Sequence, residues 1–414
     1  MLSSEDASAS GVSSASAAAP GVAAGLTRLK LTEFRCYPAA QLRLDGKKPV
    51  VLTGHNGAGK TNLLEAVSYL APGRGLRGAR LGDVTRAHAG DGSSWAVAAT
   101  VIDGEGVETK LGTGLEPVSS EAGREAGPRR ERRVVRVDGE AAGGPSALAD
   151  RVRLSWITPQ MDRLFTEAPS GRRRFLDRLV YGFDPDHARR VGVYERALRE
   201  RNKVLREYGT RADAAWLDAL EHTLAEQGIA IAAARRETVA RLRGAIATGV
   251  GPFPGAEIDL QGQVEEWLDQ MAAVDAEDRL SQHLRQARET DANASSAGAG
   301  PHKSDLLVRH KANDMPAELC STGEQKALLI AIVLAEAGIH AGMGHGAPIL
   351  LLDEVAAHLD QERRLALFEE MAVLGAQVWL TGTDRELFKT LEGEAEFFAI
   401  EDGQITAEEG GPER

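Results

Sequence analysis

Cysteines and long apolar runs are both scarce in this chain of 414 residues. The two cysteines, Cys36 and Cys320, lie far apart, which argues against a disulfide framework and favours a reducing compartment. We interpret both as small, unpaired core residues. No apolar run reaches the roughly 20 residues that are needed to cross a bilayer, so we expect a soluble protein without a membrane partner.

The two ends of the chain have few bulky apolar residues. Residues 1–25 are rich in serine and alanine, and they lack the basic start and apolar block of a signal peptide. We predict a disordered N-terminal extension there, because little apolar surface is available to offset the loss of chain entropy. Residues 409–414 are predicted to form a short tail.

Net positive charge and clustered aromatic residues, two marks of nucleic-acid binding, are also missing. The formal net charge of -12 lowers the case for DNA without excluding it, because binding depends on local basic stripes. The five tyrosines and five tryptophans are not interleaved with basic residues, so base stacking is not indicated.

The order of predicted strands and helices indicates an α/β fold of several units. Alternating apolar and polar residues predict strands before residue 160, long charged helical patterns fill residues 161–250, and strands alternate with helices again beyond Gly300. Such alternation predicts a mixed or parallel sheet with flanking helices. We expect an N-terminal lobe at 26–160, an inserted helical arm at 161–299 that ends in a flexible linker, and a C-terminal lobe at 300–408.

The glycine-rich stretch TGHNGAGKTN at residues 53–62 follows a predicted buried strand, Pro49 to Leu52, and precedes a helical pattern. It fits GxxxxGKT, in which backbone N–H groups turn toward phosphate oxygens, the lysine reaches the β- and γ-phosphates and the threonine binds Mg²⁺. The order of strand, loop and helix is that of a nucleotide site. The predicted nucleotide-binding residues are Gly54, His55, Asn56, Gly57, Ala58, Gly59, Lys60, Thr61 and Asn62.

Two carboxylates, Asp353 and Glu354, follow the apolar run Ile349 to Leu352. A buried strand would deliver them to the edge of the sheet where ligands bind. In phosphoryl transfer, an aspartate at this place supports Mg²⁺ and a following glutamate orients the attacking water. An isolated Asp-Glu pair is as consistent with a turn, and the phosphate loop upstream is what favours the catalytic interpretation.

Ser321, Thr322 and Gly323 begin a predicted helix far downstream. A helix start presents free N–H groups and the positive end of the helix dipole to an anion. Ser321 with Glu324 three positions later also fits an ordinary capping box. Both interpretations stay open, and both can hold at once.

Taken in this order, the motifs resemble the ABC-type ATPases, specifically the SMC-like branch. More closely, GHNGAGKTNLLEAVSYLAPGRGLR, PSGRRRFLDRLV, GPHKSDLL, STGEQKALLIAIVLAEA and LLLDEVAAHLD are similar to segments of the RecF family, and the resemblance covers about residues 26–406. The sequence departs from the family at Cys36, Cys320 and Thr322, where an asparagine, a leucine and the first signature glycine are usual.

The resemblance implies an ABC-type ATPase head with an inserted helical arm. It further implies an ATP-dependent homodimer in the cytoplasm that binds gapped or junction DNA and, with RecR and RecO, supports RecA loading, replication restart and the SOS response. ATP with Mg²⁺ would lie on the phosphate loop of one copy while Ser321 and Gly323 of a second copy cap the γ-phosphate. Slow hydrolysis, with Lys60, Asp353 and Glu354 as catalytic residues, would release the dimer and the DNA.

Two more residues are assigned by the resemblance. Gln160 stands where related ATPases carry a glutamine that senses Mg²⁺ and water, although a turn after Pro159 explains it equally well. Arg35 stands where relatives carry an arginine that contacts the nucleotide, and a surface arginine is the alternative. The expected Mg²⁺ ligands are therefore Thr61, Asp353 and Gln160.

Basic clusters are the candidates for DNA contact. One helix would carry four basic residues on a common face, although neighbouring glutamates also fit an ordinary solvated helix. The candidates are Arg196, Arg199, Lys203 and Arg206, with Arg74 and Arg77 in the stretch GRGLRGAR and the triplet Arg172 to Arg174 in addition. Backbone contact with double-stranded DNA fits best, and single-stranded DNA is possible.

Two other classes of function stay open. A transporter ATPase subunit would need a compact insert, and the long section at 161–250 speaks against it. An ATP-switched scaffold protein would bind ATP without productive hydrolysis, and Glu354 speaks mildly against it. His302 and Asp305 supply too few ligands for a metal site, so we interpret them as structural residues before a strand.

Overall fold

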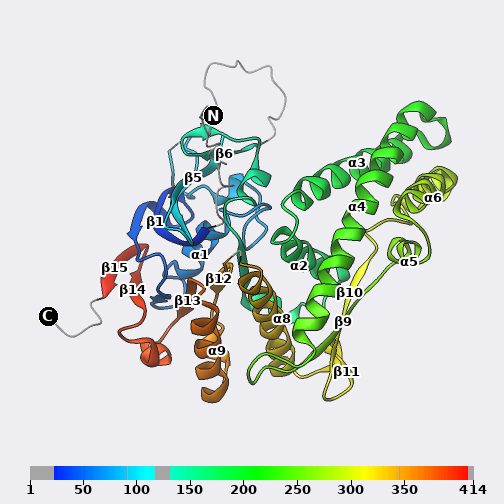
Figure 1. Cartoon of the computed structure of the whole chain (residues 1–414). Coiled ribbons are helices and arrows are strands. Elements are labelled where there is room, and N and C mark those ends of the chain that lie inside the picture. The colour runs from blue at the N-terminus through cyan, green and yellow to red at the C-terminus, as the bar shows by residue number, and fades with distance from the viewer. Residues whose placement is uncertain (1–22, 91, 117–130, 345, 409–414) are drawn as a thin grey trace, which may run out of the picture.

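The computed structural model describes residues 23–90, 92–116, 131–344 and 346–408. They form an α/β head and a helical arm beside it (Figure 1). Residues 1–22 of the predicted N-terminal extension and the predicted tail lie outside the described residues. Residues 23–25 of that extension already belong to the first strand.

The head contains two six-stranded sheets. The first is antiparallel throughout, in the order β2-β1-β4-β5-β6-β7, and the second has the order β15-β14-β3-β13-β12-β8 and is parallel except for β15. The strands of the first sheet are β1 (Ala23–Phe34), β2 (Tyr37–Arg43), β4 (Ala96–Asp103), β5 (Glu108–Leu115), β6 (Arg133–Val137) and β7 (Glu140–Ala141). Those of the second are β3 (Val50–Thr53), β8 (Leu154–Ile157), β12 (Ile349–Leu352), β13 (Val378–Gly382), β14 (Glu396–Glu401) and β15 (Gln404–Glu408).

The central strands of the second sheet are buried on both faces, which explains their continuous apolar runs. In β12, Ile349 and Leu351 join one hydrophobic core, whereas Leu350 and Leu352 join another. The first core also contains α1 (Lys60–Ser68) and the antiparallel sheet, and the second contains α8 (Thr322–Gly342) and α9 (Gln361–Leu374). The predicted α/β class with flanking helices is confirmed.

Helix α8 is the one helix among the described residues that is long and apolar enough to cross a membrane. Of its most apolar 18-residue window, 78% is buried inside the protein. Its apolar composition follows from its place in the core of the head, where side chains on most of its circumference are covered.

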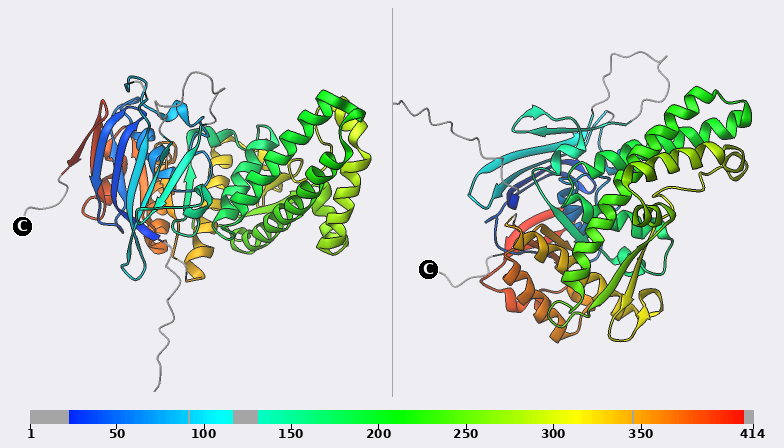
Figure 2. Two further views of the ribbon diagram at one scale, coloured as in Figure 1. Left: turned by 90° about the horizontal axis from the view of Figure 1, so that it is seen from above. Right: turned by 45° about the vertical axis from the view of Figure 1, so that its right-hand side comes forward.

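The arm consists mainly of long helices and extends away from the sheets of the head (Figure 2). Its helices are α2 (Pro169–Tyr181), α3 (His187–Tyr208), α4 (Ala214–Ile246), α5 (Gln263–Gln270), α6 (Ala273–Gln286) and α7 (Arg288–Ala294). A small sheet of β9 (Ala256–Gln261), β10 (Asp305–His310) and β11 (Met315–Pro316) packs near its base. The predicted boundary between residues 299 and 300 falls between the paired strands β9 and β10, and the division into domains stays a prediction.

The prediction that the arm ends in a flexible linker is wrong, because the segment before residue 300 is folded. Helix α7 runs through it to Ala294, and Ala297 and Ala299 are buried after the helix ends. The backbone N–H of Gly298 donates to a carboxylate oxygen of Asp291 at 3.0 Å. The small residues of this segment permit close packing against the neighbouring helices rather than loose chain.

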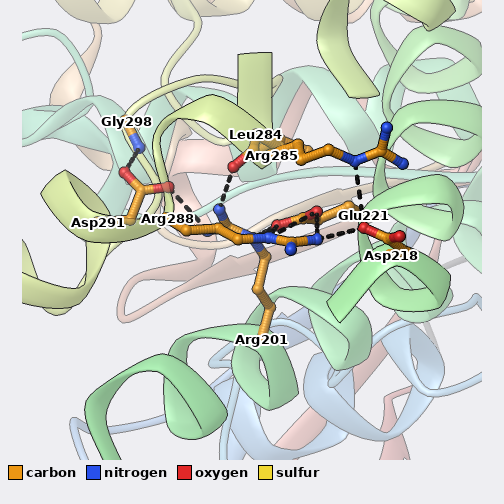
Figure 3. Close-up of polar contacts among 8 residues, drawn as sticks. All are labelled: Arg201, Asp218, Glu221, Leu284, Arg285, Arg288, Asp291 and Gly298. Carbon is orange, nitrogen blue, oxygen red and sulfur yellow. Dashed lines mark hydrogen bonds and ion pairs between the residues drawn. The ribbon is translucent and has the colours of Figure 1, made fainter. Parts of the chain in front are cut away.

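A buried ion network ties four arm helices together (Figure 3). The guanidinium of Arg201 on α3 is fully buried and donates to Glu221 on α4 at 2.9 Å, to Asp291 on α7 at 2.8 Å and to the carbonyl of Leu284 on α6 at 2.7 Å. Arg288 of α7 also pairs with Glu221. Every charge of this set has a partner, which is the condition for charges to be tolerated in a protein interior.

We expect Arg201→Met to destabilise the protein by about 3–5 kcal/mol, because it leaves the buried Asp291 carboxylate without its arginine partner and removes one of the two arginines that bind Glu221. Arg199→Met on the same helix is the control, since Arg199 is 68% exposed and its pair with Glu195 is worth less than about 1 kcal/mol. Urea unfolding of both variants measures the difference. Equal stability of the two variants would contradict the structural role of the network.

Candidate functional site

The phosphate loop leads from β3 into α1, as predicted. Gly54, Gly57 and Gly59 have φ of 145°, 88° and 121°, in a region that glycine adopts far more readily than other residues. A Cβ on Gly54 would lie 2.2 Å from the carbonyl oxygen of Ile400, so the close approach of β14 also requires glycine there. The hydroxyl of Tyr37 donates to the carbonyl of Gly59 at 3.1 Å and supports the loop from behind.

Lys60 closes the loop. Its ammonium group donates to the carbonyl oxygens of Gly54 at 2.7 Å and His55 at 2.9 Å. Burial lowers the pKa of Lys60, while the nearby carboxylates of Glu354 and Asp353 raise it. Lys60 of the loop therefore interacts electrostatically with the two carboxylates at the end of β12.

The strand-end carboxylate and the loop threonine meet directly. Thr61 Oγ1 donates to both carboxylate oxygens of Asp353, at 3.0 Å each, across 292 positions of the chain. Asp353 is 3% exposed, and burial raises its pKa while hydrogen bonds from Thr381 and Thr61 lower it. A hydroxyl beside a carboxylate offers the hard oxygen donors that Mg²⁺ prefers, and Mg²⁺ sites commonly use only one or two protein carboxylates.

Glu354 follows at the mouth of this site. It is half-buried and has a φ of 56°, which is uncommon for a residue with a Cβ. Its backbone N–H donates to the hydroxyl of Thr381 at 2.8 Å. A strained residue next to a buried carboxylate is a frequent feature of reactive sites.

Ser321 caps α8 through the capping box that the sequence indicates. Its hydroxyl donates to the Glu324 carboxylate at 2.8 Å and accepts from the Glu324 backbone N–H at 3.3 Å. Ser321 and Gly323 are both exposed. Among the described residues, no hydrogen bond or ion pair joins Ser321 to the phosphate loop, and its role toward an anion stays a prediction.

Arg35 and Arg77 share a partner that the sequence did not suggest. Both pair with the fully buried carboxylate of Glu65 on α1, at 2.7 Å each, and Arg77 also donates to Asn62 Oδ1 at 2.7 Å. Their guanidinium groups are therefore held beside the helix that begins at the phosphate loop. An acidic residue on the apolar face of a predicted helix is the signal that could have revealed this pairing, because a buried charge needs a partner.

Gln160 and Cys36 lie in turns next to the site. Gln160 is exposed in a short 3₁₀ turn that follows β8, and Asp162 of the same turn pairs with Lys326 of α8 at 3.4 Å. The prediction that Cys36 is a core residue is wrong. It is exposed in the turn between β1 and β2, where its sulfur accepts from Asn62 Nδ2 at 3.1 Å, whereas Cys320 is buried as predicted.

The predicted basic face of α3 is exposed. Arg196, Arg199, Lys203 and Arg206 all lie on the surface, while Tyr194 and Leu205 on the other side of the helix are buried. Arg74 is exposed as well. The four residues of α3 therefore share the solvent face of one rigid helix, but the structure does not place this face next to the phosphate loop.

Two arginines of the triplet that was a candidate for DNA contact, Arg172 and Arg173, bind other residues of the protein. Arg172 makes two hydrogen bonds of 2.7 Å to Asp305, and Arg173 donates to the carbonyl of Ser304 at 2.7 Å. They fix the start of β10 against α2. His302 is 2.6 Å from the Tyr194 hydroxyl, and burial lowers its pKa to about 4, so it is a neutral packing residue.

No group of three or more His, Cys, Asp or Glu residues suited to a metal ion occurs in the described part of the chain. The interpretation of His302 and Asp305 as structural residues stays a prediction. A metal at the phosphate loop would depend on hydroxyl, carboxylate and bound phosphate oxygens together.

Comparisons with known proteins show which family this chain is similar to. Residues 25–406 match the RecF/RecN/SMC N terminal domain. A DNA replication and repair protein RecF of Allorhizobium ampelinum is 49% identical over 383 residues, which span 92% of this chain and 98% of the relative. A protein with the same description from Rhizobium etli is 48% identical over 382 residues, with the same coverage.

Solved structures show the same fold. The recombination mediator protein RecF-ATPrS in the RecFOR pathway has a TM-score of 0.78 at 22% identity, and the match covers 94% of this chain and 99% of that chain. The Smc head domain of Pyrococcus furiosus, bound to the C-terminal domain of ScpA, has a TM-score of 0.50 at 15% identity and coverage of 93% and 96%. The fold is that of an ABC-type ATPase head. The chain shares nearly half of its residues with the RecF proteins of Allorhizobium ampelinum and Rhizobium etli, over almost their entire length. It therefore belongs to the RecF family of DNA replication and repair proteins.

Proposed function

We propose that this protein binds ATP with Mg²⁺, dimerises around it, binds DNA in that state and releases it by slow hydrolysis. The single observation that carries the proposal is the contact between Thr61 of the phosphate loop and Asp353 at the end of β12. It brings a phosphate-binding loop and a buried carboxylate into one site, which is the minimum arrangement for metal-assisted phosphoryl transfer.

The residues of the site have distinct proposed tasks. The N–H groups of the loop and Lys60 bind the phosphates, and Thr61 and Asp353 hold Mg²⁺, with Gln160 as a further ligand. The ion, when bound, neutralises charge on the phosphate oxygens. Glu354 holds the attacking water in line with the γ-phosphate and accepts its proton. The pairs of Arg35 and Arg77 with Glu65 place two positive groups beside the same helix.

The site is proposed to be completed by a second copy. Ser321 and Gly323 lie exposed at the start of α8, which is the positive end of the helix dipole. In a face-to-face dimer they cap the γ-phosphate that the other copy binds. ATP then stabilises the dimer because its terminal phosphate makes contacts that exist only in the paired state.

DNA is the proposed macromolecular partner. The exposed basic face of α3 suits contact with phosphates, and the relatives carry the description of DNA replication and repair. Gapped or junction DNA, the partners RecR and RecO, support of RecA loading and a cytoplasmic location follow from family membership as parts of the proposal. Membership of the RecF family also sets the transporter alternative aside.

Lys60→Ala should abolish ATP binding and, with it, the ATP-dependent dimer and DNA binding. The mass of the protein and its affinity for gapped DNA are measured with ATP, with ADP and without nucleotide. Lys389→Ala is the control, because Lys389 is 67% exposed and lies outside the site. Dimerisation and DNA binding that do not depend on nucleotide in either variant would contradict the proposed coupling.

Glu354→Gln should lower ATP turnover roughly a hundredfold or more, because it removes the general base while the phosphate loop stays intact. The dimer formed with ATP should then persist far longer than that of the parent protein, as size-exclusion chromatography after ATP removal would reveal. Parental turnover would refute the role of Glu354, and parental dimer lifetime with lost turnover would favour an ATP-switched scaffold.

Lys203→Ala should weaken DNA binding and make the slope of log affinity against log salt shallower by about 1, because one phosphate contact is lost. The same measurement on Lys389→Ala provides a matched loss of one exposed positive charge. An unchanged slope for Lys203→Ala, or an equal change in both variants, would remove α3 from the DNA surface.

A further inference from the structure

The hydroxyl of Thr381 lies between the two carboxylate residues at the end of β12. Its Oγ1 donates to Asp353 Oδ1 at 2.8 Å and accepts from the backbone N–H of Glu354 at 2.8 Å. Thr381 is 1% exposed and belongs to β13, which pairs in parallel with β12. Because Leu352 is opposite Leu380, the next residues of both strands, Asp353 and Thr381, come together at the carboxyl end of the sheet.

The backbone N–H groups of Asp353 and Glu354 are both held by neighbouring strands. The Asp353 N–H donates to the Ile157 carbonyl of β8 at 2.9 Å, and the Glu354 N–H is bound by Thr381 of β13. Glu354 has a φ of 56°, which a residue with a Cβ keeps only where its surroundings enforce it. The direction of the Glu354 side chain therefore depends on these two backbone contacts.

We propose that Thr381 is a positioning residue for ATP hydrolysis: its hydroxyl fixes the backbone of Glu354 and, together with Thr61, the orientation of the Asp353 carboxylate. The inference rests on the proposed function and deepens it. A hydroxyl is needed because it donates and accepts at the same time, which no apolar side chain of the same shape can do. Thr381 acts through Asp353 and Glu354.

Loss of the Thr381 hydroxyl would affect Asp353 and Glu354 differently. Asp353 Oδ1 keeps the hydrogen bond from Thr61 when Thr381 is replaced, so the phosphate loop retains its contact with the strand. The Glu354 N–H loses the one side-chain partner that the structure gives it. The expected defect is thus in the chemical step, where Glu354 acts, rather than in ATP binding.

Three variants test the inference. Thr381→Val keeps the shape and removes both hydrogen bonds, Thr381→Ser keeps the hydroxyl, and Thr383→Val changes an exposed threonine two positions away. Thr381→Val should lower turnover by about 10–100-fold, as losses of supporting hydrogen bonds at such sites do. Its affinity for a fluorescent ATP analogue and the mass of its ATP-bound dimer should stay close to those of the parent, and the dimer should persist longer after ATP is removed.

Thr381→Ser should recover most of the turnover, and Thr383→Val should behave as the parent does. Parental turnover in Thr381→Val would overturn the inference. An equal loss of turnover, ATP affinity and dimer mass in Thr381→Val would also overturn it, because such a loss indicates a role in folding. A Thr381→Ser variant as slow as Thr381→Val would overturn it as well. Glu354→Gln, measured in parallel, distinguishes failure of the positioning role from failure of the proposed function. Parental turnover in Glu354→Gln overturns the proposed function. Parental turnover in Thr381→Val alone overturns only the positioning role.

Discussion

The contact between the hydroxyl of Thr61 and the carboxylate of Asp353 is the interaction on which the account of this protein depends. It joins residues that are 292 positions apart, and the α/β head brings them together because β3 and β12 both end at the same edge of one parallel sheet, with β13 between them. The buried apolar strands fix that edge. The arm helices come between β8 and β12 in the sequence, yet these two strands are neighbours in the sheet. The glycine-rich loop and the two carboxylates therefore meet through the order of the strands rather than within any single segment.

The charges of the arm and its base have partners, as those of the site do. Arg172 of α2 binds Asp305 at the start of β10, and Arg201 binds Glu221 and Asp291 inside the arm. Such buried pairs stabilise little relative to apolar packing, but they tolerate few alternative arrangements. The helices of the arm, including α3 with its exposed basic face, are therefore held in one arrangement.

Much of the site could be predicted from the sequence, because the phosphate loop, the Asp-Glu strand end and the capping box of Ser321 are local patterns whose geometry depends on neighbouring residues. What the sequence did not reveal are pairings between distant segments: Glu65 with Arg35 and Arg77, and Thr381 with Glu354. A polar residue in an apolar run signals that a partner exists but not which one. Composition also misled at the end of the arm, where small residues meant close packing, and at Cys36, where a turn exposes the side chain.

The central claim is that each nucleotide site is shared between two copies, and mixing two inactive variants tests it most directly. Lys60→Ala lacks a working phosphate loop, and Ser321→Arg blocks the cap on the γ-phosphate, so each alone should fail to hydrolyse ATP. In an equimolar mixture, heterodimers combine the intact loop of one variant with the intact Ser321 of the other, and the account predicts that hydrolysis returns in part. A mixture as inactive as its components, or a Ser321→Arg protein as active as the parent, would contradict the shared site.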